Sequence, residues 1–247
     1  MLCSLNTIIS FIFARTSLNN VLIFFFRSFT GNHTEMDISS IRKDYKLKEL
    51  SENQIAGSPD IQFKLWFEEA VNSEVPEVNA MVLSTVGQNS KPSARVVLVK
   101  DFDKNGVVFY TNYESQKARE LLENPFASLT FFWPQLERQV RIEGIVEKVT
   151  EEESIKYYNS RPWESRIGAW VSNQSSEIEN REILENLFTE LDAKFKGEGT
   201  IQKPKNWGGY RLKPEFFEFW QGRPSRLHDR ICYELENESW RIFRLAP

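Results

Sequence analysis

The spacing of apolar side chains along this chain changes from the period of a helix to the period of a strand. Within residues 57–74, apolar side chains recur three to four positions apart, which predicts an amphipathic helix. The side chains of this stripe are Ile61, Leu65, Trp66 and Ala70. Ser58 is a residue type that caps helices and Pro59 suits the first helical position, so we expect the helix to begin there.

Beyond this helix the chain is dominated by runs of β-branched and aromatic residues, which is the composition of strands. The runs cover residues 79–86, 93–101, 106–112, 127–133, 138–149, 208–222, 225–235 and 240–247. Turn-forming segments such as "GQNSKP" and "DKNG" separate several of them, which is typical of an antiparallel meander. We therefore expect a mainly antiparallel sheet.

Three helical segments interrupt the strands. Residues 115–124 form the first, and residues 178–195 form an amphipathic third. Between them, Thr150 and Glu153 have the spacing of a capping box, which predicts a helix that runs toward Tyr158. Helices interleaved with an antiparallel sheet indicate an α+β fold with a barrel-like sheet, and 247 residues fit one such domain.

Composition narrows the class of function. A net charge of -4 at pH 7 and a pI near 5.5 argue against a nucleic-acid or anionic-membrane partner, because such proteins carry an excess of Lys and Arg. The only cysteines and histidines of the sequence are Cys3, Cys232, His33 and His228. We therefore expect no disulfide framework and no metal site, and this cysteine usage fits a reducing compartment.

The N-terminal segment, residues 1–34, contains no Asp or Glu and is rich in Ser, Thr, Asn and Phe. Arg15 interrupts its apolar run well short of the ~20 residues of a membrane span, and no positive region precedes that run as in a secretory signal. Two interpretations stay open: an organellar presequence, or an upstream extension with Met36 as a second start. We expect a cytoplasmic protein, or a mitochondrial one if the segment acts as a presequence.

The heptad "SRLHDRI" near the C-terminus places Arg226, His228 and Arg230 at every second position. In a β-strand these side chains would share one face, because successive side chains alternate between the two faces. Such a face could bind an anion. An ordinary solvated strand face has the same alternation, so the heptad by itself leaves both interpretations open.

Other basic side chains also adjoin the predicted strands. Arg95 and Lys100 are an odd number of positions apart, so a regular strand would point them to opposite faces unless a bulge intervenes. Thr111, Ser115 and Lys117 lie where a strand passes into a helix, and free N–H groups there can hold a phosphate; a capped helix with a solvated lysine is the alternative. The sequence has no glycine-rich nucleotide loop, nucleophile elbow or HExxH motif, which disfavours a Rossmann enzyme or a hydrolase.

Seven motifs, taken in order, resemble one family. They are "RVVLVK", "FYTN", "LERQVRIEG", "SRPWESRIGAWVSNQSS", "FEFWQG", "RLHDRI" and the terminal "RLAP". Together they make the chain from about Ile41 to Pro247 resemble the pyridoxamine 5'-phosphate oxidase family. The resemblance implies an FMN-binding split β-barrel, antiparallel with flanking helices, and a homodimer with shared active sites. It also implies FMN-dependent oxidation of pyridoxine 5'-phosphate and pyridoxamine 5'-phosphate to pyridoxal 5'-phosphate, with oxygen as acceptor and hydrogen peroxide as by-product.

The same resemblance assigns site residues by matching positions. The positions that match FMN contacts are Arg95, Val96, Val97, Leu98, Val99, Lys100, Tyr110, Thr111, Gln116, Lys117, Gln139, Gln174, Ser175, Trp220 and Arg230. The positions that match substrate contacts are Arg42, Tyr45, Lys100, Tyr157, Arg161, Ser165, Arg226, Leu227 and His228. Arg226 and His228 are the residues that we expect to act on the reacting part of the substrate, and no metal is implied.

The resemblance also divides the chain into three segments. Residues 1–35 are a presequence or disordered extension, residues 36–57 an N-terminal segment that can close over the pocket, and residues 58–247 the oxidase domain. The alternative is a split-barrel protein that carries or senses flavin or pyridoxal phosphate without turnover. Such a protein would not need the residues that match substrate contacts in addition to those that match FMN contacts.

Gln116 departs from the family pattern, which usually has arginine just before Lys117. An arginine gives a phosphate two charge-assisted hydrogen bonds, whereas a glutamine amide gives only neutral ones. We expect Gln116 to weaken the FMN phosphate site without abolishing it, and Gln116→Arg to tighten FMN roughly five- to thirtyfold. If the side chain points into solvent, the exchange will be nearly neutral.

Overall fold

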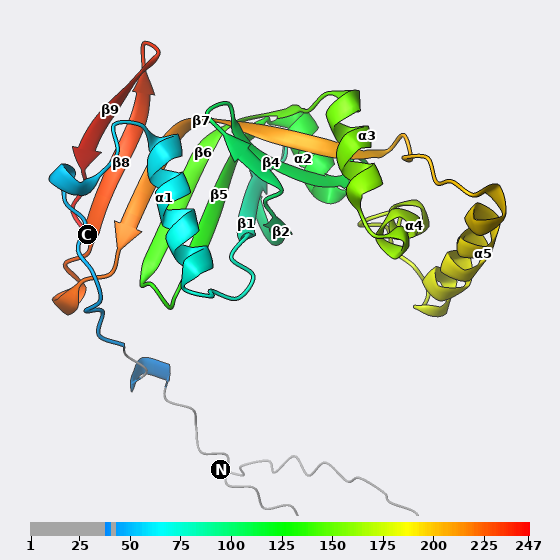
Figure 1. The fold of residues 1–247 in the computed structure, drawn as a ribbon, viewed down its shortest axis with the longest axis horizontal. Coiled ribbons are helices and arrows are strands. Elements are labelled where there is room, and N and C mark those ends of the chain that lie inside the picture. The colour runs from blue at the N-terminus through cyan, green and yellow to red at the C-terminus, as the bar shows by residue number, and fades with distance from the viewer. Residues whose placement is uncertain (1–37, 41–42) are drawn as a thin grey trace, which may run out of the picture. The chain divides into compact units, whose positions relative to one another are not determined.

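The computed structural model describes residues 38–40 and 43–247, and residues 43–247 form a unit built on one antiparallel sheet (Figure 1). Its strands are β1 (Ala80–Val86), β2 (Pro92–Leu98), β3 (Asp101–Asp103), β4 (Gly106–Asn112), β5 (Phe126–Trp133), β6 (Arg138–Lys148), β7 (Trp207–Gln221), β8 (Asp229–Glu236) and β9 (Ser239–Arg244). The strand order is β2-β1-β5-β6-β7-β4-β3, with β8 paired to β7 and β9 paired to β8.

The sheet divides along β7. One side of β7 pairs with β6 over nearly its whole length, whereas on its other side residues 207–212 pair with β4 and residues 216–221 pair with β8. Beyond the end of β2, the N–H of Lys100 donates to the carbonyl of Val108 on β4 at 2.9 Å. This bond draws the two edges of the sheet together, so the split barrel expected from the sequence is confirmed.

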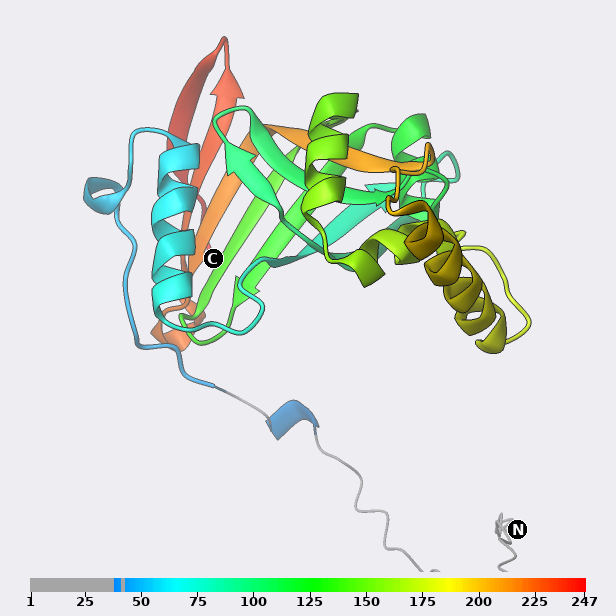
Figure 2. The ribbon, with the colours of Figure 1, turned by 45° about the vertical axis from the view of Figure 1, so that its right-hand side comes forward.

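Helices flank the sheet at both ends of this unit. They are α1 (Pro59–Asn72), α2 (Gln116–Glu123), α3 (Glu151–Ser160), α4 (Trp163–Val171) and α5 (Glu182–Glu198), with short 3-10 helices η2 (Glu52–Gln54) and η3 (Pro224–Arg226). A further 3-10 helix, η1 (Ile38–Ser40), precedes this unit in the chain. In Figures 1 and 2, α1 lies against the sheet near β8 and β9, while α3, α4 and α5 gather at the opposite end, beyond β4.

Two of the predicted helix starts have the expected caps. Ser115 accepts a hydrogen bond from the N–H of Ala118, and Thr150 forms a capping box with Glu153. Ser58 occupies the cap position of α1 and Pro59 the first helical position, so the predicted start is confirmed, but the Ser58 side chain makes no capping hydrogen bond. The first turn of α1 therefore relies on proline at its first position and on packing.

The apolar stripe predicted for α1 is wrong for half of its members. Ile61 and Leu65 are 52% and 47% exposed. The buried residues of α1 are Pro59, Gln62, Phe63, Trp66 and Ala70. The helix turns the side of Phe63, Trp66 and Ala70 to the core, and Gln62, on the same side, is satisfied there because its Oε1 accepts the N–H of Ala56 at 2.9 Å.

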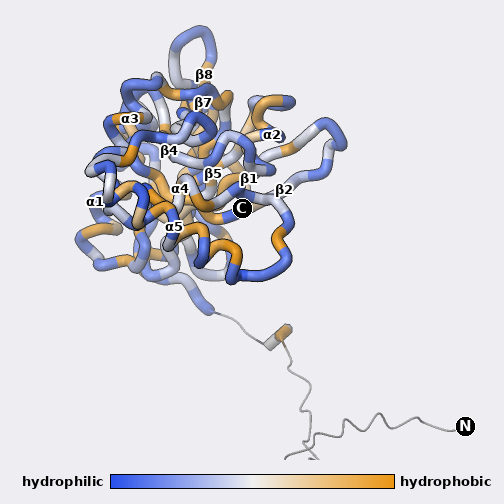
Figure 3. The backbone as a smooth tube through the Cα atoms, turned by 90° about the vertical axis from the view of Figure 1, so that its right-hand side faces the viewer, coloured by the Kyte–Doolittle hydropathy of each residue, from blue (hydrophilic) through white to orange (hydrophobic). Residues whose placement is uncertain are grey.

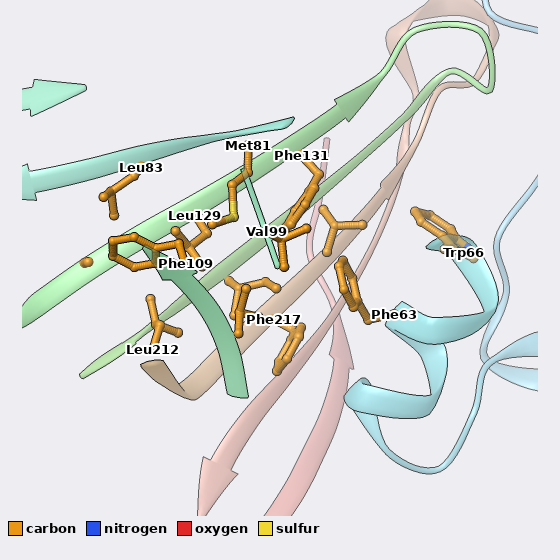
Figure 4. Packing of buried hydrophobic residues seen from close by; sticks show 14 of the residues in the cluster. Phe63, Trp66, Met81, Leu83, Val99, Phe109, Leu129, Phe131, Leu212 and Phe217 are labelled. Carbon is orange, nitrogen blue, oxygen red and sulfur yellow. The ribbon is translucent and has the colours of Figure 1, made fainter. Parts of the chain in front are cut away.

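The main core lies between α1 and the sheet (Figure 4). Phe63 packs on Phe131 with ring centroids 5.1 Å apart, and Trp66 meets Phe219 at 5.3 Å. A second cluster joins α3, α4 and α5 to the start of β7, and its buried members are Tyr158, Ile167, Phe195, Ile201 and Trp207. This second cluster holds α3 and α4 against β4 and β7, where part of the candidate site lies.

Helix α5 is amphipathic, with hydrophobic and hydrophilic residues interleaved along it (Figure 3). It begins at Glu182 rather than at residue 178, and Phe188 and Leu191 pack with Phe195 on the second cluster. Within residues 38–40 and 43–247, none of the helices combines the length and the apolar character that a membrane crossing needs.

Candidate functional site

Lys117 is a buried cation at the start of α2, with 8% of its surface exposed. Its Nζ lies 2.8 Å from Oε1 of Gln174, 3.2 Å from Oγ1 of Thr111 and 3.3 Å from Oγ of Ser115. All three partners are neutral, and no carboxylate of the described residues pairs with this ammonium. Burial, and then the charge of Arg95, lowers the pKa of Lys117 to about 8. A buried cation without a counter-ion is suited to binding an anion.

The loop before α5 contributes further groups to this place. Gln174 Oε1 accepts from the hydroxyl of Thr111 at 3.0 Å, and Ser175 Oγ accepts the N–H of Gln116 at 3.2 Å. We call Lys117, Thr111, Gln174 and Ser175 the first anion site. The solvated lysine of the alternative interpretation is wrong, because the ammonium turns inward even though α2 is capped.

Arg95 lies on β2 beside the first anion site. Its guanidinium donates to the hydroxyls of Thr85 and Ser93 and pairs with Glu120 of α2, with Nη2 and Oε2 3.2 Å apart. Lys100 is exposed and lies beyond the end of β2. No regular strand relates Arg95 to Lys100, because β2 ends at Leu98, so the expected alternation does not apply to this pair.

A second cation without a counter-ion lies between α3 and α4. The guanidinium carbon of Arg161 lies 4.7 Å from the ring centroid of Trp207, and Nη1 is buried without a hydrogen-bond partner in the described chain. Burial lowers the pKa of Arg161, but a guanidinium remains charged in proteins. Tyr157 on α3 and Ser165 in the first turn of α4 are half-buried. We call Arg161, Tyr157 and Ser165 the second anion site.

Stacked rings connect the second anion site to β4. Tyr110 stacks on Tyr157 with centroids 3.9 Å apart and on Trp207 at 5.5 Å. Burial is the main cause that raises the pKa of Tyr110 to about 12, so its phenol keeps its proton. Because Tyr110 and Thr111 are consecutive residues of β4, this one strand connects the two anion sites.

A third group of side chains, His228 and Trp220, lies at the other end of β7. The ring of His228 lies 4.6 Å from that of Trp220 and 5.9 Å from that of Tyr45. His228 Nδ1 accepts the backbone N–H of Arg223 at 3.1 Å, so the neutral ring carries its proton on Nε2. Burial, and then the charge of Arg226, lowers the pKa of His228. At pH 7 the imidazole is therefore neutral and has an Nε2–H donor.

The alternating row predicted for Arg226, His228 and Arg230 is wrong at its first two members. β8 begins only at Asp229, and Arg226 belongs to η3, where Ser225 and Arg226 have φ of 57° and 62°. The chain must reverse between β7 and β8 so that the two strands can pair, and this turn breaks the period of two. Arg226 is exposed, and its charge acts on His228 from the turn rather than from a strand face.

Arg230 belongs to a different row, which the pairing register defines. One residue from each of four adjacent strands forms this outer row: Phe132, Gln139, Trp220 and Arg230. Arg230 pairs with Glu218 through two contacts of 2.8 and 3.0 Å. Thr111 of the first anion site pairs with Gly208 near the start of β7, whereas Trp220 of the outer row lies near its end. At the rise of a strand, the outer row is therefore about 40 Å along β7 from the first anion site.

The remaining predicted positions are dispersed between the core and the surface. Val99 is buried in the core at 4% exposure, and Val97 packs against the core. Val96 and Leu98 are 66% and 38% exposed on the outer face, and Leu227 is 69% exposed. Contact between FMN and all of residues 95–100 therefore cannot be through side chains alone, because Val99 points into the core.

The segment before η2 crosses the end of β7 as a strap. Tyr45 lies so close to Gly222 that a Cβ there would come within 2.7 Å of the tyrosine ring. The buried Glu137, in the turn before β6, accepts the N–H groups of Lys46 and Leu47 at 2.8 and 3.1 Å. These bonds hold Tyr45 against the third group.

Asp229 and Arg244 hold the strap further along. Asp229 accepts the N–H of Leu50 at 3.1 Å and pairs with Arg244 at 2.7 Å, and Arg244 also pairs with Glu52 at 2.8 Å. The sequence predictions missed Glu137 and Asp229 as positioning groups. Both lie inside motifs quoted above, "LERQVRIEG" and "RLHDRI", which was the available signal. Arg42, predicted to act with Tyr45, lies outside the described residues.

Two family models match this chain. The model described as pyridoxamine 5'-phosphate oxidase matches residues 67–195, and the model described as pyridoxine 5'-phosphate oxidase C-terminal dimerisation region matches residues 207–247. The chain belongs to the pyridoxamine 5'-phosphate oxidase family. The resemblance drawn from the seven motifs is thereby confirmed, and so is a homodimer as the expected assembly of this oxidase.

Relatives and solved structures agree with the family. A pyridoxine/pyridoxamine 5'-phosphate oxidase of Gloeothece citriformis is 53% identical over 214 residues, which are 86% of this chain and 100% of that protein. PhzG from Burkholderia lata 383, in complex with tetrahydrophenazine-1-carboxylic acid, is 30% identical with a TM-score of 0.77, over 81% of this chain and 99% of its own. A pyridoxamine 5'-phosphate oxidase-related, FMN binding protein from Nostoc punctiforme shares the fold, with a TM-score of 0.62 and 18% identity over 78% of this chain and 100% of its own.

The cofactor of this oxidase is FMN, and the residues of the first anion site fit a phosphate. A buried ammonium without a counter-ion, the hydroxyls of Thr111 and Ser175, and the start of α2 converge there. The helix dipole at the start of α2 favours an anion for the same electrostatic reason as the ammonium does, although the N–H groups of Gln116 and Ala118 already donate to Ser175 and Ser115.

Proposed function

We propose that the first anion site holds the phosphate of FMN and that the second holds the phosphate of the vitamin B6 substrate. The observation that carries this proposal is a pair of cations, the buried Lys117 and the half-buried Arg161 with its buried Nη1, neither of which has a carboxylate partner in the described part of the chain. FMN and the substrate each bring one phosphate, so two such sites are needed. Tyr110 and Thr111 are consecutive residues of β4 and point to opposite faces of it, so the two sites lie on either side of this strand.

The chain is an FMN-dependent oxidase that converts pyridoxine 5'-phosphate and pyridoxamine 5'-phosphate to pyridoxal 5'-phosphate. FMN, when bound, supplies the redox chemistry by accepting a hydride. The residues of the chain bind and orient the substrate: Arg161, Tyr157 and Ser165 at its phosphate, and His228 through Nε2–H at a substrate oxygen. We further propose oxygen as the final acceptor, with hydrogen peroxide as product.

We propose that each active site is shared between two subunits. The third group and the outer row lie in the dimerisation region or beside it, about 40 Å along β7 from the first anion site. The face of the outer row also exposes large apolar side chains: Val82, Val96, Leu98, Phe126 and Phe132. A second copy on this face would cover them and bring its Trp220, Arg226, His228 and Arg230 to the phosphate sites of the first.

The N-terminal segments are assigned as in the sequence analysis. We propose that residues 36–57 include a lid, because the strap holds Tyr45 against His228 and Trp220. Residues 1–35 are proposed to be a presequence or an upstream extension. We propose a cytoplasmic location, or a mitochondrial one if residues 1–35 act as a presequence.

Substitutions at the end of β7 test the division between substrate and cofactor. Arg226→Leu and His228→Ala should slow oxidation of pyridoxine 5'-phosphate about ten- to a hundredfold and leave FMN bound, because each removes a polar contact to the substrate only. Arg230→Leu should instead release FMN. Oxygen consumption and the flavin absorbance retained after gel filtration measure the two effects. If Arg226→Leu lost its flavin while Arg230→Leu kept it, Arg226 would be the FMN contact and Arg230 the substrate contact.

A chain that begins at Met36 should bind FMN and oxidise pyridoxine 5'-phosphate at the rate of the full chain. The reason is that the Gloeothece citriformis relative is matched over its full length by 214 of the 247 residues. Flavin absorbance and oxygen consumption of the two proteins, purified in parallel, provide the comparison. An insoluble or flavin-free short chain beside an active full chain would place residues 1–35 in the folded core.

A further inference from the structure

The chain supplies its own carboxylate to Arg95. Oε2 of Glu120 accepts hydrogen bonds from the Ser93 hydroxyl at 2.6 Å and from the Thr85 hydroxyl, and it lies 3.2 Å from Nη2 of Arg95. These side chains are mostly buried: the side chain of Arg95 is 21% exposed and that of Glu120 is 13% exposed. The guanidinium is therefore engaged by an anion of its own chain before any phosphate arrives.

Glu120 remains ionised in this setting. Burial acts to raise its pKa, but the hydrogen bonds from Ser93, Thr85, Gln116 and Arg95 outweigh burial and lower the pKa to about 2. A carboxylate with four donors is a stable negative charge at any pH at which the protein works. Its interaction with Arg95 is a hydrogen-bonded ion pair, which is stronger than an exposed pair because the two groups are partly shielded from water.

The same carboxylate lies within electrostatic reach of the first anion site. Arg95 and Glu120 both act on the ammonium of Lys117, the former by repulsion and the latter by attraction. The three charges therefore form one cluster, with two cations and one anion. A phosphate bound at Lys117 and Arg95 would be repelled by the carboxylate that already holds Arg95.

We propose that Glu120 is a counter-anion built into the FMN phosphate site: it competes with the phosphate for Arg95 and so limits the affinity of the chain for FMN. This inference rests on the proposed assignment of the first anion site to the FMN phosphate. Glu120 is a specificity-determining residue in this sense, because its effect is confined to ligands that carry a phosphate.

Gln116 acts through the same carboxylate. Its Nε2 donates to Oε1 of Glu120 at 2.8 Å, one helical turn away, and its side chain is exposed. An arginine at position 116 would pair with Glu120 and so weaken the pairing of this carboxylate with Arg95. The exposed side chain at position 116 matches the alternative in which direct contact with the phosphate contributes little. The tightening expected of Gln116→Arg then comes from relief of Glu120, and it should be small when Glu120 is already neutral.

The test is a titration of the FMN-free protein with FMN and, separately, with riboflavin, followed by flavin fluorescence at low ionic strength. Glu120→Gln keeps the size and the acceptor oxygen but removes the charge. It should lower the Kd for FMN about tenfold and leave the Kd for riboflavin unchanged. Glu123→Gln is the matched control, since Glu123 lies on the same helix, accepts the N–H of Gln88 at 3.0 Å and belongs to neither anion site.

The double variant completes the test. Gln116→Arg should tighten FMN in the wild-type background and change it less than twofold in the Glu120→Gln background, because both substitutions relieve the same repulsion. An unchanged or higher Kd for FMN in Glu120→Gln, in a protein that still prefers FMN to riboflavin, would overturn the proposal and make Glu120 a support for Arg95. Equal Kd values for FMN and riboflavin in the wild type would instead overturn the assignment of the phosphate site itself.

Discussion

Lys117→Met should raise the Kd for FMN about ten- to a hundredfold and leave the Kd for riboflavin unchanged. Methionine has nearly the length of lysine but no charge, so it fills the buried space without binding the phosphate. The ammonium contacts only neutral oxygens, from Thr111, Ser115 and Gln174, so its charge is available to an anion. Riboflavin lacks the phosphate and therefore reports binding of the ring system alone.

The pH dependence of FMN binding should follow the same lysine. Burial, and then Arg95, lowers the pKa of Lys117 to about 8. Below this pH the free protein already carries the proton that the phosphate needs. Above it, binding requires proton uptake, so the Kd for FMN should rise with pH from about 8 upward in the wild type. In Lys117→Met this rise should be absent.

The control for Lys117→Met is Lys196→Met, because Lys196 is exposed on α5 and pairs with Asp192 at 2.7 Å. It should leave the affinity for FMN and its pH dependence as in the wild type. If Lys117→Met bound FMN as tightly as the wild type, with the same rise above pH 8, the phosphate of FMN would have to lie elsewhere.

Arg161→Met should raise the KM for pyridoxine 5'-phosphate about ten- to a hundredfold while the Kd for FMN stays within twofold. Nη1 of Arg161 is buried without a hydrogen-bond partner in the described residues, so a substrate phosphate would satisfy it. Methionine can still pack on the ring of Trp207, which the guanidinium now covers at 4.7 Å. Steady-state oxygen consumption gives KM, and flavin fluorescence gives the Kd.

Two further variants separate charge from geometry at the second anion site. Arg161→Lys keeps the charge but loses the planar pair of donors, so its KM should lie between those of the wild type and Arg161→Met. Arg181→Met removes an exposed cation of the segment before α5, paired there with Glu185, and should not change KM. A KM unaffected by Arg161→Met would remove Arg161 from the substrate site.

Local signals predicted some elements and not others, for a physical reason. The start of α3 was predicted from the capping box of Thr150 and Glu153, because a cap acts over three or four residues, and Ser115 caps α2 as in the alternative interpretation of that segment. Helix α4 was not predicted, since it begins after Pro162 without a side-chain cap and is held by its packing on the second cluster. The prediction of the buried face of α1 was partly wrong, because the sheet selects the side of Phe63, Trp66 and Ala70 and leaves Ile61 and Leu65 exposed.

Periodicity, turn formers and motif order are local properties of the chain, so the α+β class, the family and the residue types of both anion sites could be predicted before the fold was known. Which of the cations are free depends on tertiary contacts. Lys117 is buried through a contact with Gln174, 57 positions away, and Arg95 is engaged by Glu120, 25 positions away. Burial and ion pairing depend on which distant segments meet, and a pattern read along one dimension does not contain that information.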